Sequence, residues 1–177
     1  MEIIETSIEG LVILQPKIFK DERGYFMESF KESFFKKYFP SLHFIQDNES
    51  ESSYGVLRGL HYQTHPFEQT KLVRVIEGEI LDVVVDLRND SSTFGKWLSF
   101  KLSAVNKHQL LIPKGFAHGF LTLTNKAIVS YKVDNEYSKD HESGIIYNDL
   151  NLNIDWGEIS EEKLIISAKD LMLKNFK

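Results

Sequence analysis

Short segments rich in β-branched and aromatic residues alternate with turn residues along most of the chain. The turns recur roughly every 8 to 12 residues, a spacing that favours a β-sandwich or barrel over βαβ units. Helical patterns occur only at 31–39, ending before Pro40, and from near Ser167 onward. The sequence therefore predicts an all-β protein with a few short helices. Its strands are expected at 11–19, 24–30, 43–50, 56–63, 71–78, 79–88, 96–103, 109–115, 119–124, 127–133 and 143–149.

Residues 71–88 hold two strong predicted strands joined by a turn at 77–79, which is most simply interpreted as a β-hairpin. In the second strand one alternating set of side chains is entirely apolar. The other set places Asp82 and Asp86 beside Ile80 and Val84. Carboxylates beside apolar side chains indicate that this face of the strand looks into a polar cavity or onto a partner subunit. The alternative is the amphipathic face of an edge strand.

The composition is that of an ordinary globular protein, and we expect one domain covering 1–177. Hydrophobic residues make up 42% and charged residues 27% of the 177 residues, enough for one core. The formal net charge of −5 argues against nucleic-acid binding as the main function. Cysteine is absent, and the N-terminal segment resembles neither a signal peptide nor a membrane span. We therefore expect a cytoplasmic protein without a membrane partner.

Two histidine segments, HYQTH at 61–65 and PKGFAH at 113–118, resemble the metal-binding motifs of the cupins, which are small β-barrels. The second motif matches, and Glu68 could supply a carboxylate. In the first, Gln63 occupies the place of the second histidine, and an amide is a poor ligand for a divalent transition metal. His65 precedes a proline in a predicted loop and cannot easily replace that ligand. We therefore expect no metal site.

Without a metal, His61 is free to act as an acid or base, because its ordinary pKa of about 6.5 lies near working pH. A single histidine in a strand more often has a structural than a catalytic role, so the residues near His61 decide between the two. Lys71 begins the next strand and could stabilise a developing enolate. Tyr131 and Tyr137 could deliver a proton from the opposite side, with ordinary strand packing as the alternative.

The chain resembles the dTDP-4-dehydrorhamnose 3,5-epimerase family almost from end to end. Ten motifs occur in that family's order and spacing, which is far more specific than any one of them. They are DERGYFMESF, FIQDN, VLRGLHYQ, KLVR, GEILDVVVDLR, TFGKW, IPKGFAHGF, YK, WGE and SAKD.

The resemblance implies a cupin-like jelly roll that is metal-free, needs no cofactor and forms a homodimer. It also implies inversion at C3 and C5 of dTDP-4-keto-6-deoxy-D-glucose, which gives dTDP-4-keto-L-rhamnose. His61 would be the base, oriented by Asp170, with Lys71 at the enolate oxygen and Tyr131 as the acid. The family's substrate-binding positions correspond to Arg23, Glu28, Gln46, Asn48, Arg58 and His118. A sheet that is apolar on both faces gives the homodimer modest independent support.

Two of these assignments leave alternatives open. Ser167 and Asp170 also fit a helix capping box, and one aspartate is not expected to serve both roles fully. Arg58 and His61 should face opposite sides of a regular strand. Either Gly59 bends the strand, or Arg58 reaches a substrate from the strand's edge or in the partner subunit.

Two positions depart from the family pattern: the loop at 138–142 lacks a frequent proline, and Tyr147 stands where tryptophan is common. These two departures bear on the substrate more than on the type of reaction. Two alternatives therefore stay open: a mono-epimerase of C3 or C5, and an epimerase of another 4-keto nucleotide sugar. A metal-dependent cupin enzyme and a non-catalytic sugar-binding jelly roll are the rival functions.

Overall fold

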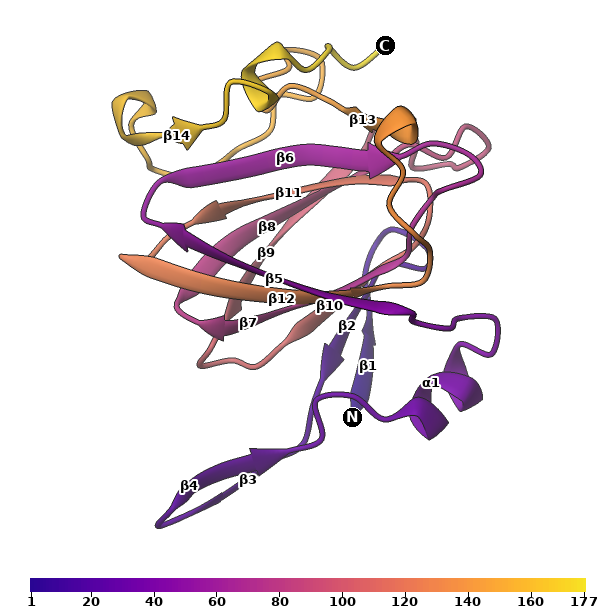
Figure 1. Ribbon diagram of the computed structural model, residues 1–177, viewed down its shortest axis with the longest axis vertical. Helices are drawn as coiled ribbons and strands as arrows, with labels where there is room; N and C mark the ends of the chain where they lie inside the picture. Colours follow the sequence, from indigo (N-terminus) through magenta and orange to yellow (C-terminus); the bar gives the residue numbers. More distant parts are fainter.

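Two β-sheets face each other and enclose the main hydrophobic core (Figure 1). The computed structural model describes residues 1–177. The first sheet contains, in spatial order, β1 (Glu2–Glu5), β2 (Val12–Gln15), β10 (Gln109–Ile112), β7 (Lys71–Glu77), β12 (Lys126–Val133) and β5 (Gln46–Ser53). The second contains β13 (Glu142–Gly144), β6 (Val56–Gln63), β11 (Phe116–Thr122), β8 (Glu79–Asp86) and β9 (Trp97–Ser103). All these pairings are antiparallel, and β14 (Ile165–Ile166) joins β6 in parallel. The predicted all-β architecture is confirmed.

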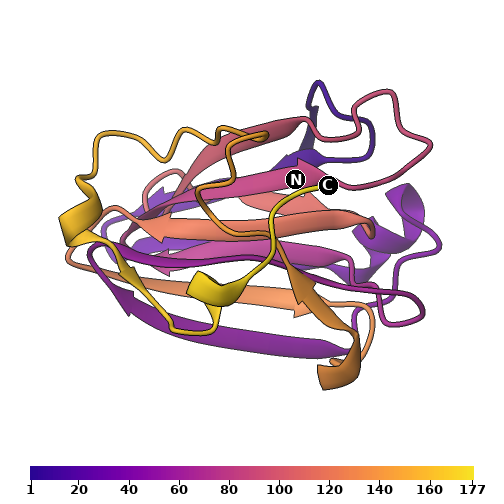
Figure 2. The same ribbon diagram turned by 90° about the horizontal axis from the view of Figure 1, so that it is seen from above.

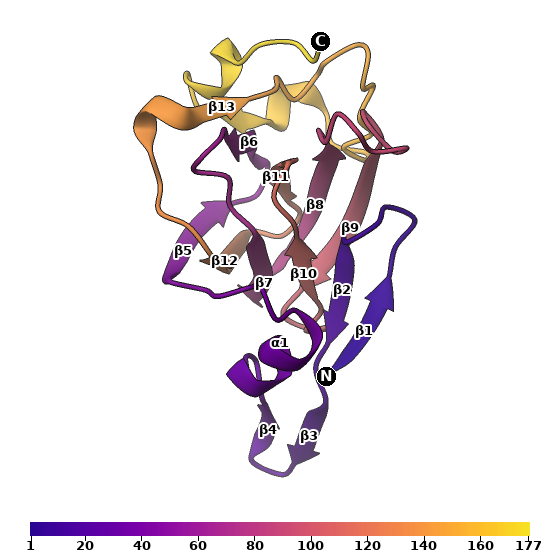
Figure 3. The same cartoon turned by 90° about the vertical axis from the view of Figure 1, so that its right-hand side faces the viewer.

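A two-stranded ribbon, β3 (Ile18–Asp21) and β4 (Gly24–Met27), projects from the body of the molecule (Figures 1 and 3). The strand predicted at 11–19 is therefore divided, into β2 and β3, at Pro16. Proline has no N–H for a strand ladder, so the chain leaves the sheet there.

The predicted hairpin at 71–88 is wrong. β7 pairs with β10 and β12 in the first sheet, whereas β8 pairs with β11 and β9 in the second. The turn between them is a corner that carries the chain from one sheet to the other, and Gly78 adopts a φ of +77° there. A β-carbon on Gly78 would lie 2.1 Å from the carbonyl oxygen of Lys126, so the corner requires glycine.

Both sheets have apolar outer faces that the chain itself covers. The helix α1 (Glu32–Tyr38) packs Phe35 against Val12, Leu14 and Leu72 on the first sheet. The C-terminal segment lies across the second sheet (Figure 2), where Trp156 joins the outer cluster. Strand β8 is consequently buried on both faces, and the uncovered apolar sheet expected for a dimer interface is not present.

The helix predicted at 31–39 is confirmed as α1, but the one expected from Ser167 is wrong. Only a single 3₁₀ turn, Asp170–Met172, forms there, besides the similar turns Lys139–His141 and Glu161–Lys163. Leu171 and Met172 are exposed, so a longer helix would have no apolar face to bury. None of the helices is long and apolar enough to cross a membrane.

Candidate active site

A cavity of about 570 Å³ opens between the two sheets and gathers most of the predicted site residues. Strands β7 and β12 supply Lys71 and Tyr131 from the first sheet. The second sheet and the C-terminal turn supply the opposite wall, which includes Arg58, His61, His118 and Asp170. Side chains from two sheets thus face one another across the space where a ligand would lie.

His61 and Asp170 form a hydrogen-bonded pair at one wall of this cavity. The Nε2 atom of His61 lies 2.8 Å from Oδ1 of Asp170, although 109 residues separate them in the chain. Burial lowers the pKa of His61, and the Asp170 charge opposes that effect. The imidazole is therefore held in one orientation with one ring nitrogen engaged, as a general base requires.

Asp170 is itself fixed by its surroundings. Its Oδ2 accepts a hydrogen bond from the N–H of Gly59 at 3.2 Å. Its own N–H donates to Oγ of Ser167 at 3.1 Å. The cap-like contact and the histidine pairing coexist because the backbone of Asp170 makes the first and its carboxylate makes the second.

The backbone at Gly59 explains how Arg58 and His61 line the same cavity. The register between β6 and β11 shifts within this stretch, and Gly59 has a φ of +120°. A β-carbon on Gly59 would lie 2.6 Å from Cα of Gly119, so two glycines are needed where the strands approach. Of the two explanations open from the sequence, the bend at Gly59 is the one observed. Arg58 donates to Oγ of Ser52 at 3.0 Å.

Lys71 and Tyr131 lie on neighbouring strands and share the opposite wall. Burial lowers the pKa of Lys71 to about 8, against the opposing charges of Asp82 and Glu142. Burial raises the pKa of Tyr131, with Arg58 opposing. At neutral pH the cavity therefore holds a lysine ammonium beside a phenol that keeps its proton, which are groups suited to stabilise an enolate and to protonate carbon.

His118 is held by Asp82, whose Oδ2 lies 2.8 Å from Nε2 of the ring. Asp82 does not line the cavity itself, but it contacts the polar cavity indirectly, through a histidine of the cavity wall. Asp86 differs, since its carboxylate binds Arg88 through Nε at 2.9 Å.

An adjoining hollow shares His61, Lys71 and Tyr131 with the main cavity and extends it toward Gln46 and Asn48. The amide of Gln46 donates to Oδ1 of Asn48 at 2.8 Å. Both side chains therefore lie where the cavity continues beyond the acid and base candidates.

Glu142 was missed by sequence reasoning, although it borders His61 in this hollow. It accepts hydrogen bonds from Tyr137, at 2.7 Å, and from Lys169. Burial favours its neutral form, but these donors prevail and lower the pKa of Glu142. An isolated glutamate after a loop gives no sequence signal. Tyr137 is exposed and engaged with Glu142, which leaves Tyr131 as the enclosed phenol.

Arg23 and Glu28 lie away from this cavity. Arg23 is on the projecting ribbon with its side chain 84% exposed, and it pairs with Asp21. Glu28 follows β4 and pairs with Lys31 at 2.8 Å. Within one chain the structure does not bring either residue to the other site residues.

No group of three histidine, aspartate or glutamate side chains is arranged to hold a metal ion. The amide of Gln63, in the place of the missing cupin ligand, accepts a hydrogen bond from the N–H of Ser138 at 3.0 Å. His65 is exposed and lies 3.5 Å from Glu68. The donor set in and around the cavity therefore does not fit a cupin metal centre.

Comparison with known proteins shows the family of this chain. The family model for dTDP-4-dehydrorhamnose 3,5-epimerase matches residues 5–177. A dTDP-4-dehydrorhamnose 3,5-epimerase of Shigella flexneri is 49% identical over 99% of this chain and 96% of its own. The crystal structure of the Bacillus anthracis enzyme with TDP and PPi bound has a TM-score of 0.94 and 47% identity, covering 99% of both chains.

A Legionella pneumophila dTDP-6-deoxy-D-glucose-3,5-epimerase in complex with dTDP-4-keto-L-rhamnose has a TM-score of 0.93 and 46% identity. The match covers 98% of this chain and 92% of the Legionella pneumophila chain. The predicted cupin-like fold is confirmed by these likenesses. With a family model that spans nearly the whole sequence, the chain belongs to the dTDP-4-dehydrorhamnose 3,5-epimerase family.

Proposed function

We propose that this protein is a dTDP-4-dehydrorhamnose 3,5-epimerase that converts dTDP-4-keto-6-deoxy-D-glucose to dTDP-4-keto-L-rhamnose in dTDP-L-rhamnose biosynthesis. One observation carries the proposal. The His61–Asp170 pair and Tyr131 belong to opposite walls of one cavity, and Lys71 lies on the Tyr131 side. Epimerisation requires a base and an acid on opposite faces of a carbon, and this arrangement supplies them.

The reaction uses the acidity of carbons next to a ketone. Both C3 and C5 flank the C4 carbonyl, so removal of either proton gives an enolate. His61 takes the proton from one face, and the Lys71 ammonium stabilises the negative oxygen. Tyr131 then donates its proton to carbon from the other face, which inverts the centre. Solvent restores both side chains to their starting protonation states before the second carbon reacts.

The nucleotide is expected to extend from the sugar cavity into the adjoining hollow. Gln46 and Asn48 offer amide donors and acceptors there. Arg58 and His118 line the main cavity, which supports assigning them to bind the diphosphate or the sugar oxygens. A site with these groups needs no cofactor and no metal.

We propose that the enzyme is a homodimer in which the ribbon of one subunit docks on the other. Phe19, Tyr25 and Phe26 on this ribbon are 51%, 55% and 66% exposed, an unusual aromatic content for a solvated hairpin. Docking would bury these rings and bring Arg23 and Glu28 near a partner's cavity. Sedimentation of the wild type and of Phe26→Glu tests this, and a monomeric wild type would refute it. The cysteine-free sequence suits a reducing cytoplasm, the compartment we propose.

The function is tested by incubating the protein with dTDP-4-keto-6-deoxyglucose in D₂O, with and without chelator, and by following C3 and C5 by NMR. We expect deuterium to enter at both carbons, and the rate at each carbon should be the same with and without chelator. Exchange at one carbon would identify a mono-epimerase, and loss of exchange with chelator would identify a metal-dependent enzyme. No exchange at either carbon would leave a binding protein and reject the proposal.

A further inference from the structure

Asp82 is a buried carboxylate whose hydrogen bonding is incomplete. The residue has no exposed area, and it faces Phe120 and Phe100 across the neighbouring strands. Its Oδ2 binds His118, but Oδ1 is buried without any hydrogen-bond partner. A half-satisfied carboxylate in apolar surroundings destabilises a fold, so a functional reason is needed.

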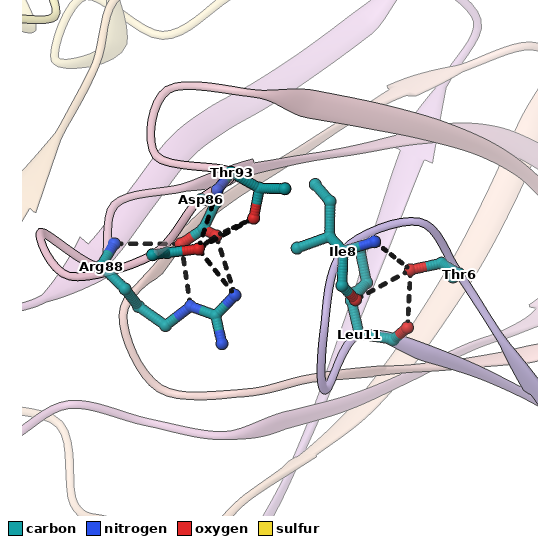
Figure 4. A network of polar contacts seen from close by, with 7 residues as sticks. Thr6, Ile8, Leu11, Asp86, Arg88 and Thr93 are labelled. Atoms are coloured by element: carbon teal, nitrogen blue, oxygen red, sulfur yellow. Dashed lines mark hydrogen bonds and ion pairs between the residues drawn. The ribbon is translucent and has the colours of Figure 1, made fainter.

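Asp86 provides an internal comparison on the same strand. It lies four residues further along β8, on the same face, and also has no exposed area. Its carboxylate is fully engaged by Arg88, Ser91 and Thr93 (Figure 4). These donors outweigh burial and hold the pKa of Asp86 well below its usual range. The fold can therefore satisfy a buried carboxylate on this strand, and at Asp82 it does not.

The cavity also holds a cation without a partner. Lys71 alternates along β7 with Val73 and Val75, which lie in the core between the sheets, so its side chain faces inward toward the second sheet. The ion pairs of this chain engage other lysines, and none holds Lys71. Asp82 shares its face of β8 with Ile80 and Val84, which lie in the same core, so its carboxylate also points into the space between the sheets. It does not line the cavity itself but lies behind His118, which does.

We propose that Asp82 is a positioning residue of the epimerase site, which orients the His118 ring and serves as the counter-charge that keeps Lys71 protonated. The inference rests on the proposed function, because enolate chemistry is what requires the ammonium. Burial disfavours the charged lysine, and Asp82 is the largest influence that opposes this effect. Glu142 adds a smaller contribution from β13.

Other charged groups around Lys71 set the background against which Asp82 acts. They are Glu49 from β5, Arg58, His61 and Tyr62 from β6, His118 from β11, Tyr131 from β12, Tyr137 from the loop before β13, Glu142 from β13, and Lys169 and Asp170 from the C-terminal segment. None of these changes in Asp82→Asn, which keeps the shape of the side chain and removes its charge. The variant therefore isolates the counter-charge.

The test is an NMR titration of the Lys71 ammonium in the enzyme without substrate. In the wild type we expect a midpoint near pH 8, and in Asp82→Asn a midpoint lower by about one pH unit. The basic limb of the kcat/KM profile should move down by the same amount, while the acidic limb stays in place. Asp86→Asn, the matched control, should lose stability and leave both the titration and the profile unchanged.

Two outcomes would overturn the inference. One is an Asp82→Asn titration that matches the wild type and Asp86→Asn. The other, which needs no variant to fold, is a wild-type ¹⁵N spectrum in which the neutral His118 ring is protonated at Nδ1 rather than at Nε2. Failure of the proposed function is separable, because wild-type enzyme would then exchange no deuterium while the titration would still report the effect of Asp82.

Discussion

Replacing Lys71 by methionine should abolish epimerisation and make the folded protein more stable. Methionine has a similar length and no charge, so it fills the same space without a buried ammonium. Each pKa unit corresponds to about 1.4 kcal/mol. Lowering the pKa of Lys71 from 10.5 to about 8 therefore destabilises the folded state by at most about 3.5 kcal/mol at pH 7.

The sign and the pH range of this effect follow from the two protonation states. Below pH 8 the ammonium is charged in both the folded and the unfolded chain, so the full cost is present. Between pH 8 and 10.5 only the unfolded chain stays protonated, and the cost fades as the pH rises. Lys71→Met should accordingly raise the melting temperature by up to about 7 to 14 °C at pH 7, and by progressively less above pH 8.

The assay is urea and thermal unfolding at one protein concentration, at pH 7 and pH 10, alongside turnover. Lys132→Met is the matched control, because Lys132 lies on the adjacent strand and pairs with Asp47 at 2.6 Å. Its removal should change stability by less than about 1 kcal/mol. The reasoning would be refuted if Lys71→Met were no more stable than the wild type at pH 7. A gain that persisted undiminished at pH 10 would show that packing, rather than charge, causes it.

Three further predictions follow from the same geometry. The wild-type kcat/KM profile should be bell-shaped, with an acidic limb below pH 6.5 from His61 and a basic limb near pH 8 from Lys71; a profile flat between pH 5 and 9 would contradict it. Asp170→Asn should lower kcat and move the acidic limb further down, because Asp170 raises the pKa of His61; an unmoved limb would contradict the pairing. Gly59→Ala should lower the free energy of unfolding, measured in urea, by about 2 kcal/mol or more, whereas Gly24→Ala should lower it by less, because Gly24 has a similar φ but open space around it. Equal losses in the two variants would show that the close approach of the strands at Gly59 is not the cause.

The sequence predicted most of the strands because each of these carries its own local signal, but it missed β1, and the strand predicted at 143–149 ends at Gly144. The segment 56–63 coincides with β6, and the helix at 31–39 matches α1 to within a residue or two. Pairing was harder, because a hairpin and a corner between sheets leave the same pattern of apolar residues. Whether β7 pairs with β8 depends on β10, β11 and β12, which follow much later in the chain.

In the candidate site, too, contacts between residues far apart in the chain could not be predicted from local patterns. Residues with a strong motif, such as His61 and Lys71, could be named in advance. The pairing of Asp170 with His61 could not be derived locally, because the same residues also fit a helix cap and the contact spans 109 residues. Asp82 carried a signal, a carboxylate at an apolar position, whereas its partner His118 is set by the register of β8 and β11.

The central claim is that acid and base act from opposite walls of one cavity, and Tyr131→Phe tests it most directly. In D₂O with dTDP-4-keto-6-deoxyglucose, His61 can still remove a proton and return a deuteron to the same face. The account predicts that this variant incorporates deuterium next to the ketone while inversion falls by about 10² to 10⁴-fold, and that His61→Asn loses both. Inversion by Tyr131→Phe at the wild-type rate, or exchange that persists in His61→Asn, would contradict it.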